Sequence, residues 1–248
     1  MHCEWETCFV EIAGKPAILR CDTAAGRELA QIDAPNLLQV QLELEGPDAD
    51  GLPGPQDRER VRDLGRELRE WLAAVGGRLV AELTGNGLHS WFFYVPCGWL
   101  EGANLVHRIG LRRGVSLGVE MRPDARHKVY EALLPTENET RRTRNLQALS
   151  ALMERGDDLR QPRPVEHAVR FDNRTQAVAF ADWARRQGYV VVGMQTLDGG
   201  AVVLQFQRVM APEMARLDAD TAGIMAAARQ LGGVYQGWQT EVRLAQAG

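Results

Sequence analysis

Cysteine, lysine and long apolar runs are scarce in this chain of 248 residues. The four cysteines, Cys3, Cys8, Cys21 and Cys97, form no C-x-x-C pair, which argues against a disulfide framework and a standard zinc knuckle. No apolar run approaches the roughly 18 residues that span a bilayer, so we expect no membrane-spanning segment. The first residues place acids ahead of any apolar stretch, unlike a secretory signal, and this order predicts a cytoplasmic protein.

A surplus of positive charge is missing as well. Residues 1–142 hold 17 Lys and Arg against 22 Asp and Glu, and the rest of the chain holds 12 against 11. Neither part has the basic excess of a domain that grips a nucleic-acid backbone. Phosphate loops, paired-histidine helices and catalytic triads in a plausible context are also missing, so the sequence predicts no cofactor and no enzymatic activity.

Apolar residues make up 45% of the chain, enough for a substantial core, and their spacing gives the same order of elements twice. In the first half, period-two and helical patterns alternate as strand 37–45, helix 57–75, strands 78–84 and 89–95, helix 99–111 and strand 116–122. In the second half, the corresponding segments are strand 165–171, helix 174–187, strands 189–194 and 201–207, helix 212–231 and strand 234–242.

The repeated order βαββαβ is that of a ferredoxin-like sandwich. The sequence therefore predicts an α+β protein with two tandem ferredoxin-like sandwiches and an extra N-terminal β-hairpin. We expect helices on one face of each sheet. Residues 135–142 are polar with few apolar anchors, and we place the domain boundary there, giving domains 1–140 and 141–248.

Phe92 and Tyr94 are predicted on the face of the first sheet that has no helix. Aromatic side chains on this strand are where RNA-binding folds of the same topology stack bases, so an RNA-binding module is one alternative function. The basic and glycine-rich surroundings of that signature are missing, and no direct contact with nucleic acid is expected. Packing against the hairpin or the second domain explains these aromatics at least as well.

A metal-dependent enzyme is the other alternative. Period two places His167 on the helix-facing side of its strand, which favours a satisfied, half-buried histidine. Grouped with Asp157 and Asp158, the same histidine would form a site of two carboxylates and an imidazole for a divalent ion.

Four segments of the second half carry a family resemblance: residues 152–159 (LMERGDDL), 164–167 (PVEH), 188–191 (GYVV) and 235–240 (YQGWQT). On these residues the second half resembles the regulator of ribonuclease E activity B family, small cytoplasmic bacterial proteins with a ferredoxin-like fold. The first half looks like an uncharacterised domain family often fused ahead of such a regulator, on Trp5, residues 14–16, 37–44 and 92–94.

The resemblance implies a non-catalytic regulator that binds a protein partner, an endoribonuclease in that family, and alters RNA turnover. The residues that carry it and that we expect at the contact surface are Asp157, Asp158, Glu166, Tyr235, Gly237 and Trp238. Glycine within a strand is typical of a bulge, and a neighbouring tryptophan is either an interface anchor or a core residue. The identity of the partner, the effect on it and the oligomeric state stay open.

Overall fold

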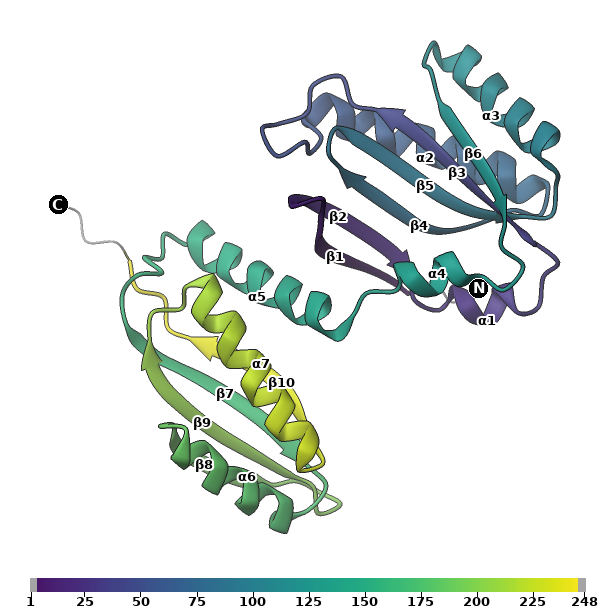
Figure 1. Ribbon diagram of the computed structural model, residues 1–248. Helices are drawn as coiled ribbons and strands as arrows, with labels where there is room; N and C mark the ends of the chain where they lie inside the picture. Colours follow the sequence, from purple (N-terminus) through teal and green to yellow (C-terminus); the bar gives the residue numbers. More distant parts are fainter. Residues whose placement is uncertain (1–3, 245–248) are drawn as a thin grey trace. The chain divides into compact units, whose positions relative to one another are not determined.

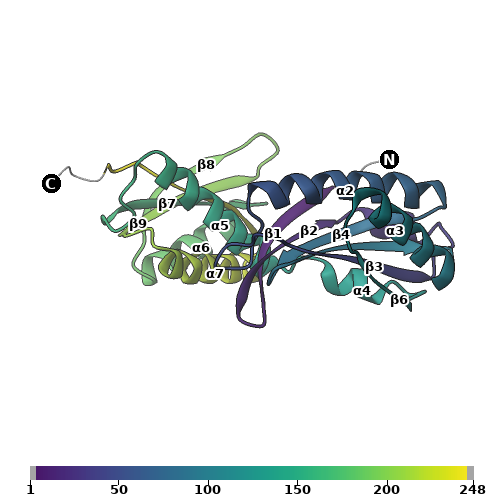
Figure 2. The same cartoon turned by 90° about the horizontal axis from the view of Figure 1, so that it is seen from above.

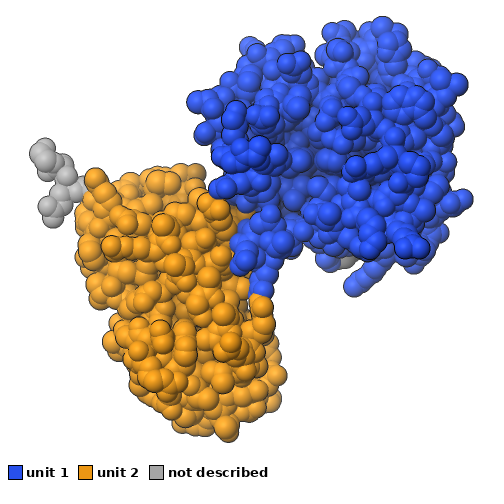
Figure 3. Space-filling view, viewed as in Figure 1, with its two compact units in different colours: residues 1–140 blue, residues 141–248 orange. Residues whose placement is uncertain are grey.

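Two antiparallel sheets organise the chain in the computed structural model, which describes residues 4–244 (Figure 1). The chain divides into unit 1, residues 1–140, and unit 2, residues 141–248 (Figure 3). Among the described residues no helix is long and apolar enough to cross a membrane. Cys8, Cys21 and Cys97 are buried free thiols, and Cys3 lies outside the described residues.

Unit 1 contains a six-stranded sheet in the order β1-β2-β4-β5-β3-β6. Its elements along the chain are β1 (Trp5–Ile12), β2 (Lys15–Asp22), α1 (Ala25–Leu29), β3 (Asn36–Glu43), α2 (Pro55–Ala74), β4 (Arg78–Gly85), β5 (Leu88–Val95), α3 (Trp99–Arg113), β6 (Gly118–Pro123) and α4 (Lys128–Leu133). The order from β3 to β6 is the predicted βαββαβ. The predicted hairpin is β1 and β2, and it extends the same sheet because β2 pairs antiparallel with β4.

Helices cover both faces of the unit 1 sheet. Leu38, Trp91 and Phe93 pack on one face in a cluster with residues of α2 and α3. On the other face, Phe92 and Tyr94 pack in a cluster with residues of α1 and α4, and Figure 2 shows α2 and α4 on opposite sides of the strands. The expectation of helices on one face alone is therefore wrong for unit 1. Helices α1 and α4 have five and six residues, too few to show a helical period in the sequence.

Tyr130 attaches α4 to this second face. Its hydroxyl donates to the Asp22 carbonyl oxygen at 2.9 Å and accepts from the backbone amide of Gly26 at 3.1 Å. The Tyr94 hydroxyl donates to the Asp124 carboxylate at 2.6 Å, just ahead of the same helix. These tyrosines combine apolar burial with a satisfied hydroxyl, as buried tyrosines usually do.

Unit 2 repeats the fold with fewer strands, in the sheet order β10-β7-β9-β8. Its elements are α5 (Glu137–Glu154), β7 (Arg163–Phe171), α6 (Arg174–Arg186), β8 (Val190–Thr196), β9 (Val202–Met210), α7 (Met214–Gln230) and β10 (Gly233–Thr240). The order from β7 to β10 is again the predicted βαββαβ. Residues of α6 and α7 pack on Val169, Leu204 and Phe206, and residues of α5 pack beside them on Val165.

Helix α5 begins at Glu137, so the polar stretch 135–142 largely forms its first turns. Thr136 and Glu139 form a capping box: the Thr136 amide donates to the Glu139 carboxylate at 2.7 Å, and the Glu139 amide donates to the Thr136 hydroxyl at 3.3 Å. The division between units 1 and 2 falls inside this helix.

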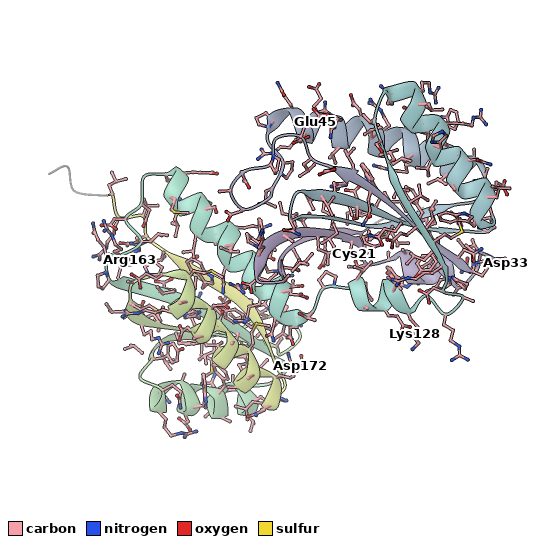
Figure 4. The ribbon with its side chains drawn as sticks, turned by 45° about the horizontal axis from the view of Figure 1, so that its top comes forward. Cys21, Asp33, Glu45, Lys128, Arg163 and Asp172 are labelled. Atoms are coloured by element: carbon pink, nitrogen blue, oxygen red, sulfur yellow. The ribbon has the colours of Figure 1, made fainter. Side chains whose placement is uncertain are left out.

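We predict that Tyr130→Ala lowers the free energy of unfolding of unit 1 by about 3 kcal/mol, because it empties a buried site and leaves hydrogen-bonding groups unpaired. Urea unfolding followed by circular dichroism measures the loss. Lys128→Ala in the same helix is the control, since the Lys128 side chain points away from the fold (Figure 4). Equal stability of the two variants would contradict the covering role of α4.

Candidate functional site

Strand β10 carries a bulge at Gly237. The register of β10 on β7 shifts between Tyr235 and Gly237, so that Gln236 is inserted without a partner of its own. Gly237 has a φ of +123°, which side chains with a Cβ rarely adopt. Because side chains alternate along a strand, the extra residue brings Tyr235 and Trp238, three positions apart, onto the same face.

Tyr235 and Trp238 both face the helices of unit 2. The Tyr235 hydroxyl lies 2.8 Å from Nδ1 of His167, and the Trp238 indole Nε1 donates to Oδ1 of Asn145 in α5 at 2.9 Å. The Trp238 ring is partly buried against the cluster that includes Leu149. Both aromatic side chains of the bulge therefore hold β10 against the helix layer.

His167 connects the bulge to a buried ionic group. Its Nε2 lies 3.2 Å from Oδ2 of Asp220, although the two are not aligned as a hydrogen bond. Asp220 also pairs with Arg208 and accepts from the Tyr189 hydroxyl at 2.5 Å. Burial, and then the positive charge of Arg208, lower the pKa of His167 to about 4. The imidazole is therefore neutral at neutral pH. His167 lies on the helix-facing side, where the sequence placed it, but it is fully buried and not half-buried.

A second bulge lies on the opposite edge of the same sheet. The register of β8 on β9 shifts between Val191 and Gly193, so that Val192 is inserted opposite Gln205. Gln205 pairs with Ala168, the residue that faces the bulge in β10. The two bulges therefore lie on one row that crosses all four strands. Since bulges increase local twist and bend a strand, this row is where the sheet is expected to be most curved.

The face of the unit 2 sheet away from the helices, here called the open face, is hollow at this row. The hollow has a volume of about 240 Å³. Its lining residues come from all four strands: Glu166, His167, Ala168, Val192, Gln205, Phe206, Gln236, Gly237, Trp238 and Gln239. The side chains of His167, Phe206 and Trp238 lie on the helix side, so these three residues offer main chain to the hollow.

Glutamine dominates the polar surface around the hollow. Register places four glutamine side chains on the open face, Gln195, Gln205, Gln207 and Gln239, and the inserted Gln236 also lines the hollow. Glu166 lies among them, and its Oε2 accepts a hydrogen bond of 2.8 Å from the Gln239 amide. The open face therefore presents the amides of the glutamines, the Glu166 carboxylate at the hollow, and exposed valine side chains.

Two family models match separate parts of the chain. Residues 3–130, more than half of the sequence, match the model of a family of unknown function, DUF695. The chain belongs to this family. Residues 142–240 match the model of the Regulator of ribonuclease activity B family, RraB. The two-part resemblance predicted from the sequence is confirmed, and residues 142–240 are called the RraB region below.

Solved structures give weaker likenesses, and no match is found among the curated proteins. A protein described provisionally as a glycine cleavage system transcriptional repressor aligns over 83% of this chain and 98% of its own, with 10% identity and a TM-score of 0.25. An unknown protein from Galdieria sulphuraria aligns over 84% of this chain and 98% of its own, with 10% identity and a TM-score of 0.23.

Asp157 and Asp158, which the sequence predicted at the contact surface, bind arginine side chains. The Asp157 carboxylate accepts from Arg163 at 2.6 Å, and neither side chain of this pair is exposed. The other Asp157 oxygen accepts from the backbone amide of Arg243 at 2.8 Å. Asp158 pairs with Arg160 at 3.1 Å. The Asp157 side chain therefore fastens the start of β7 to the segment after β10. Asp158 contacts the same segment through its main chain, since its amide donates to the Arg243 carbonyl oxygen at 2.8 Å.

The structure does not bring Asp157, Asp158 and His167 together as a metal site. Asp157 and Asp158 bind arginines, whereas His167 contacts Tyr235 and Asp220. Within residues 4–244, no group of three or more His, Cys, Asp or Glu side chains is placed to hold a metal ion.

The proposed RNA-stacking surface at Phe92 and Tyr94 is also contradicted. The exposed fractions are 5% for Phe92 and 0% for Tyr94. Leu29 of α1 and Tyr130 of α4 pack in the same cluster and cover them. Sequence alternation put both aromatics on the correct face. It gave no signal for the two short helices that close that face.

Sequence reasoning missed most residues that shape the site in the RraB region. Gln205 and Gln207 alternate with buried residues of β9, so period two could have placed them on the open face. Asn145, Arg208 and Asp220 carried no such signal, because their roles depend on contacts between different elements of the fold. Asn145, for example, binds Trp238, which is more than 60 residues away in the sequence.

Gly237→Ala is predicted to destabilise the RraB region by more than about 1 kcal/mol, because alanine is strained at this positive φ. Nothing lies within 4 Å of the added Cβ, so the effect is one of backbone conformation. Gly223→Ala, in α7 with open space around it, is the matched control and is predicted to be neutral or stabilising. Urea unfolding measures both, and destabilisation by the two variants alike would contradict the bulge argument.

Acid should weaken unit 2 through His167. The pKa of His167 is about 4 in the fold and 6.5 as the ordinary value, so the unfolded chain binds the proton first. Stability is therefore complete above pH 6.5 and falls by about 1.4 kcal/mol per pH unit as the pH drops toward 4. His167→Gln should remove this slope from the unfolding transition of unit 2, measured in urea across that pH range.

His89 provides the matched comparison in unit 1. Burial, and then Arg20, lower its pKa to about 3, which gives the same sign of pH dependence. His89→Gln should reduce the slope of the unit 1 transition and leave that of unit 2 in place. A unit 2 slope that persists in His167→Gln would show that another group takes up the proton.

Proposed function

We propose that this chain is a non-catalytic regulator that binds a ribonuclease by protein-protein contact and alters RNA turnover in the cytoplasm. The observation that carries the proposal is the match of the RraB model to residues 142–240. This match begins in α5 and ends with β10, so it includes the whole βαββαβ fold of unit 2.

The open face is the surface that best supports such a contact. The opposite face of the sheet is filled by α5, α6 and α7. Four valines on the open face and its edges are more than half exposed: Val190, Val192, Val209 and Val234. Valines interspersed with glutamines combine apolar area with groups that can bond a partner's main chain. Two of the expected contact residues, Glu166 and Gly237, lie on this face.

The remaining expected contact residues act from behind the surface in this proposal. Tyr235 and Trp238 hold the bulge through His167 and Asn145, and so position Gly237 and its neighbours on the open face. Asp157 fixes the start of β7 through Arg163, and Asp158 pairs with Arg160 in the loop ahead of it. They are positioning residues for the interface.

A non-catalytic role fits the geometry of the one acid-base cluster in the RraB region. Asp220, His167 and Tyr235 bring a carboxylate, an imidazole and a phenol close together, and groups of these types can transfer protons when they lie in an open cleft. His167 is 1% exposed and Asp220 is 4% exposed, and both side chains lie between the sheet and α7. A substrate on the open face would lie on the other side of the sheet.

Ala168→Arg should abolish capture of the ribonuclease, because a long charged side chain would then fill the hollow at the centre of the open face. The tagged chain is incubated with native cell extract, with and without nuclease treatment, and captured proteins are identified by mass spectrometry. Val178→Arg is the matched control, since Val178 is exposed on α6 in the helix layer.

Retention of a ribonuclease after RNA digestion, by the native chain and by Val178→Arg, is the expected result. The purified ribonuclease should then cleave RNA at a different rate when the native chain is added. Loss of capture on nuclease treatment would mean that RNA bridges the two proteins, and equal capture by Ala168→Arg would exclude the open face.

A further inference from the structure

The hollow on the open face presents hydrogen-bond acceptors and no cation. Glu166 contributes a carboxylate, while Gln205, Gln236 and Gln239 contribute amides. Neither lysine nor arginine is among the lining residues. Arg170 is on the same face of β7 but one row further along, opposite Val203, and outside the lining. Among the described residues, Glu166 is therefore the one charged residue of the lining.

Hydrogen bonds within the lining increase this bias toward acceptors. The amide group of Gln239 donates to Glu166 at 2.8 Å, and that of Gln236 donates to the carbonyl oxygen of Val234 at 3.2 Å. Both glutamines therefore keep their side-chain oxygens as acceptors. An ionised carboxylate has about four acceptor positions, so the single bond from Gln239 leaves most of the capacity of Glu166.

The apolar side chains that line the hollow on the open side are few and small. Ala168, Val192 and Gly237 contribute at most a few methyl groups, and Gly237 has no side chain at all. The volume of about 240 Å³ is below the range of roughly 300 to 1,000 Å³ typical of small-molecule pockets. A single long side chain with an apolar stem and a cationic head matches these dimensions.

We propose that the hollow receives one arginine side chain of the partner protein, with the guanidinium on Glu166 and on the glutamine oxygens. This inference rests on the proposed function. A guanidinium has five donors in a planar fork and can bind a carboxylate through two of them. The acceptors of the hollow lie on neighbouring strands, β10, β7 and β9, and so suit a fork better than the single ammonium group of lysine.

Other cationic or polar ligands lack a matching group in the hollow. Free arginine carries an α-carboxylate, for which the lining offers no cation. Nucleic-acid phosphates need the same missing cations, and no aromatic side chain of the lining faces the open side for base stacking. An arginine within a polypeptide has neither requirement.

The test uses the full-length chain and a capped Gly-Arg-Gly tripeptide as the probe, followed by NMR titration. Expected are shifts at residues 166–168, 205 and 236–239, and affinity at least tenfold higher than for the same peptide with citrulline, which has the shape of arginine without its charge. Glu166→Gln should bind the arginine peptide at least tenfold more weakly. Glu213→Gln, the same change on the helix side, should bind it like the native chain.

Three results would overturn the proposal: equal binding of the arginine and citrulline peptides, equal binding by Glu166→Gln, or no shifts at these residues with about 10 mM peptide, which would saturate a site with a Kd near 1 mM. The spectrum of Glu166→Gln without peptide shows directly whether the variant is folded. Peptide binding without capture of a ribonuclease would support this site and reject the proposed function. Capture of a ribonuclease without peptide binding would support the proposed function and reject this arginine site.

Discussion

The glycine bulge in β10 is the constraint on which the arrangement of unit 2 depends. A regular strand would send Tyr235 and Trp238 to opposite faces, and one of the two aromatic rings would then lie on the open side. The positive φ of Gly237 inserts one residue, so both rings reach the helix layer, where His167 and Asn145 bind their polar atoms. The same insertion places Gln236 and Gly237 together at the hollow.

The two faces of the unit 2 sheet therefore differ in the polar groups that they carry. The helix side contains the buried charges, where Asp220 binds Arg208 and lies beside a neutral His167. Buried charges of this kind need partners, because an unpaired one costs several kcal/mol. The open side has no such network, and its polar groups are mostly amides that bond equally well to water or to a partner. A surface of this type can be changed without loss of the core, which suits an interface.

Unit 1 uses the same fold differently. Its β1-β2 hairpin widens the sheet, and the two short helices α1 and α4 then cover a face that is uncovered in unit 2. Asp22 joins these parts: its side chain is fully buried, binds Arg78 at 2.5 Å and accepts from the amide of Glu4 at 3.0 Å. Covering this face removes Phe92 and Tyr94 from solvent. Of the two sheets, the one with a face that no described helix covers is therefore in unit 2.

The sequence by itself determined the strand and helix order of both units, the hairpin, the family resemblance and the side of the strand on which His167, Phe92 and Tyr94 lie. These features depend on alternation and helical periodicity, which neighbouring residues in the chain carry. Glycine at 237 also indicated the bulge. Only the tertiary structure decided that α1 and α4 cover Phe92 and Tyr94, that arginines bind Asp157 and Asp158, and that the two bulges share one row. These outcomes depend on pairing between distant segments, and one inserted residue reverses the face of every side chain that follows it.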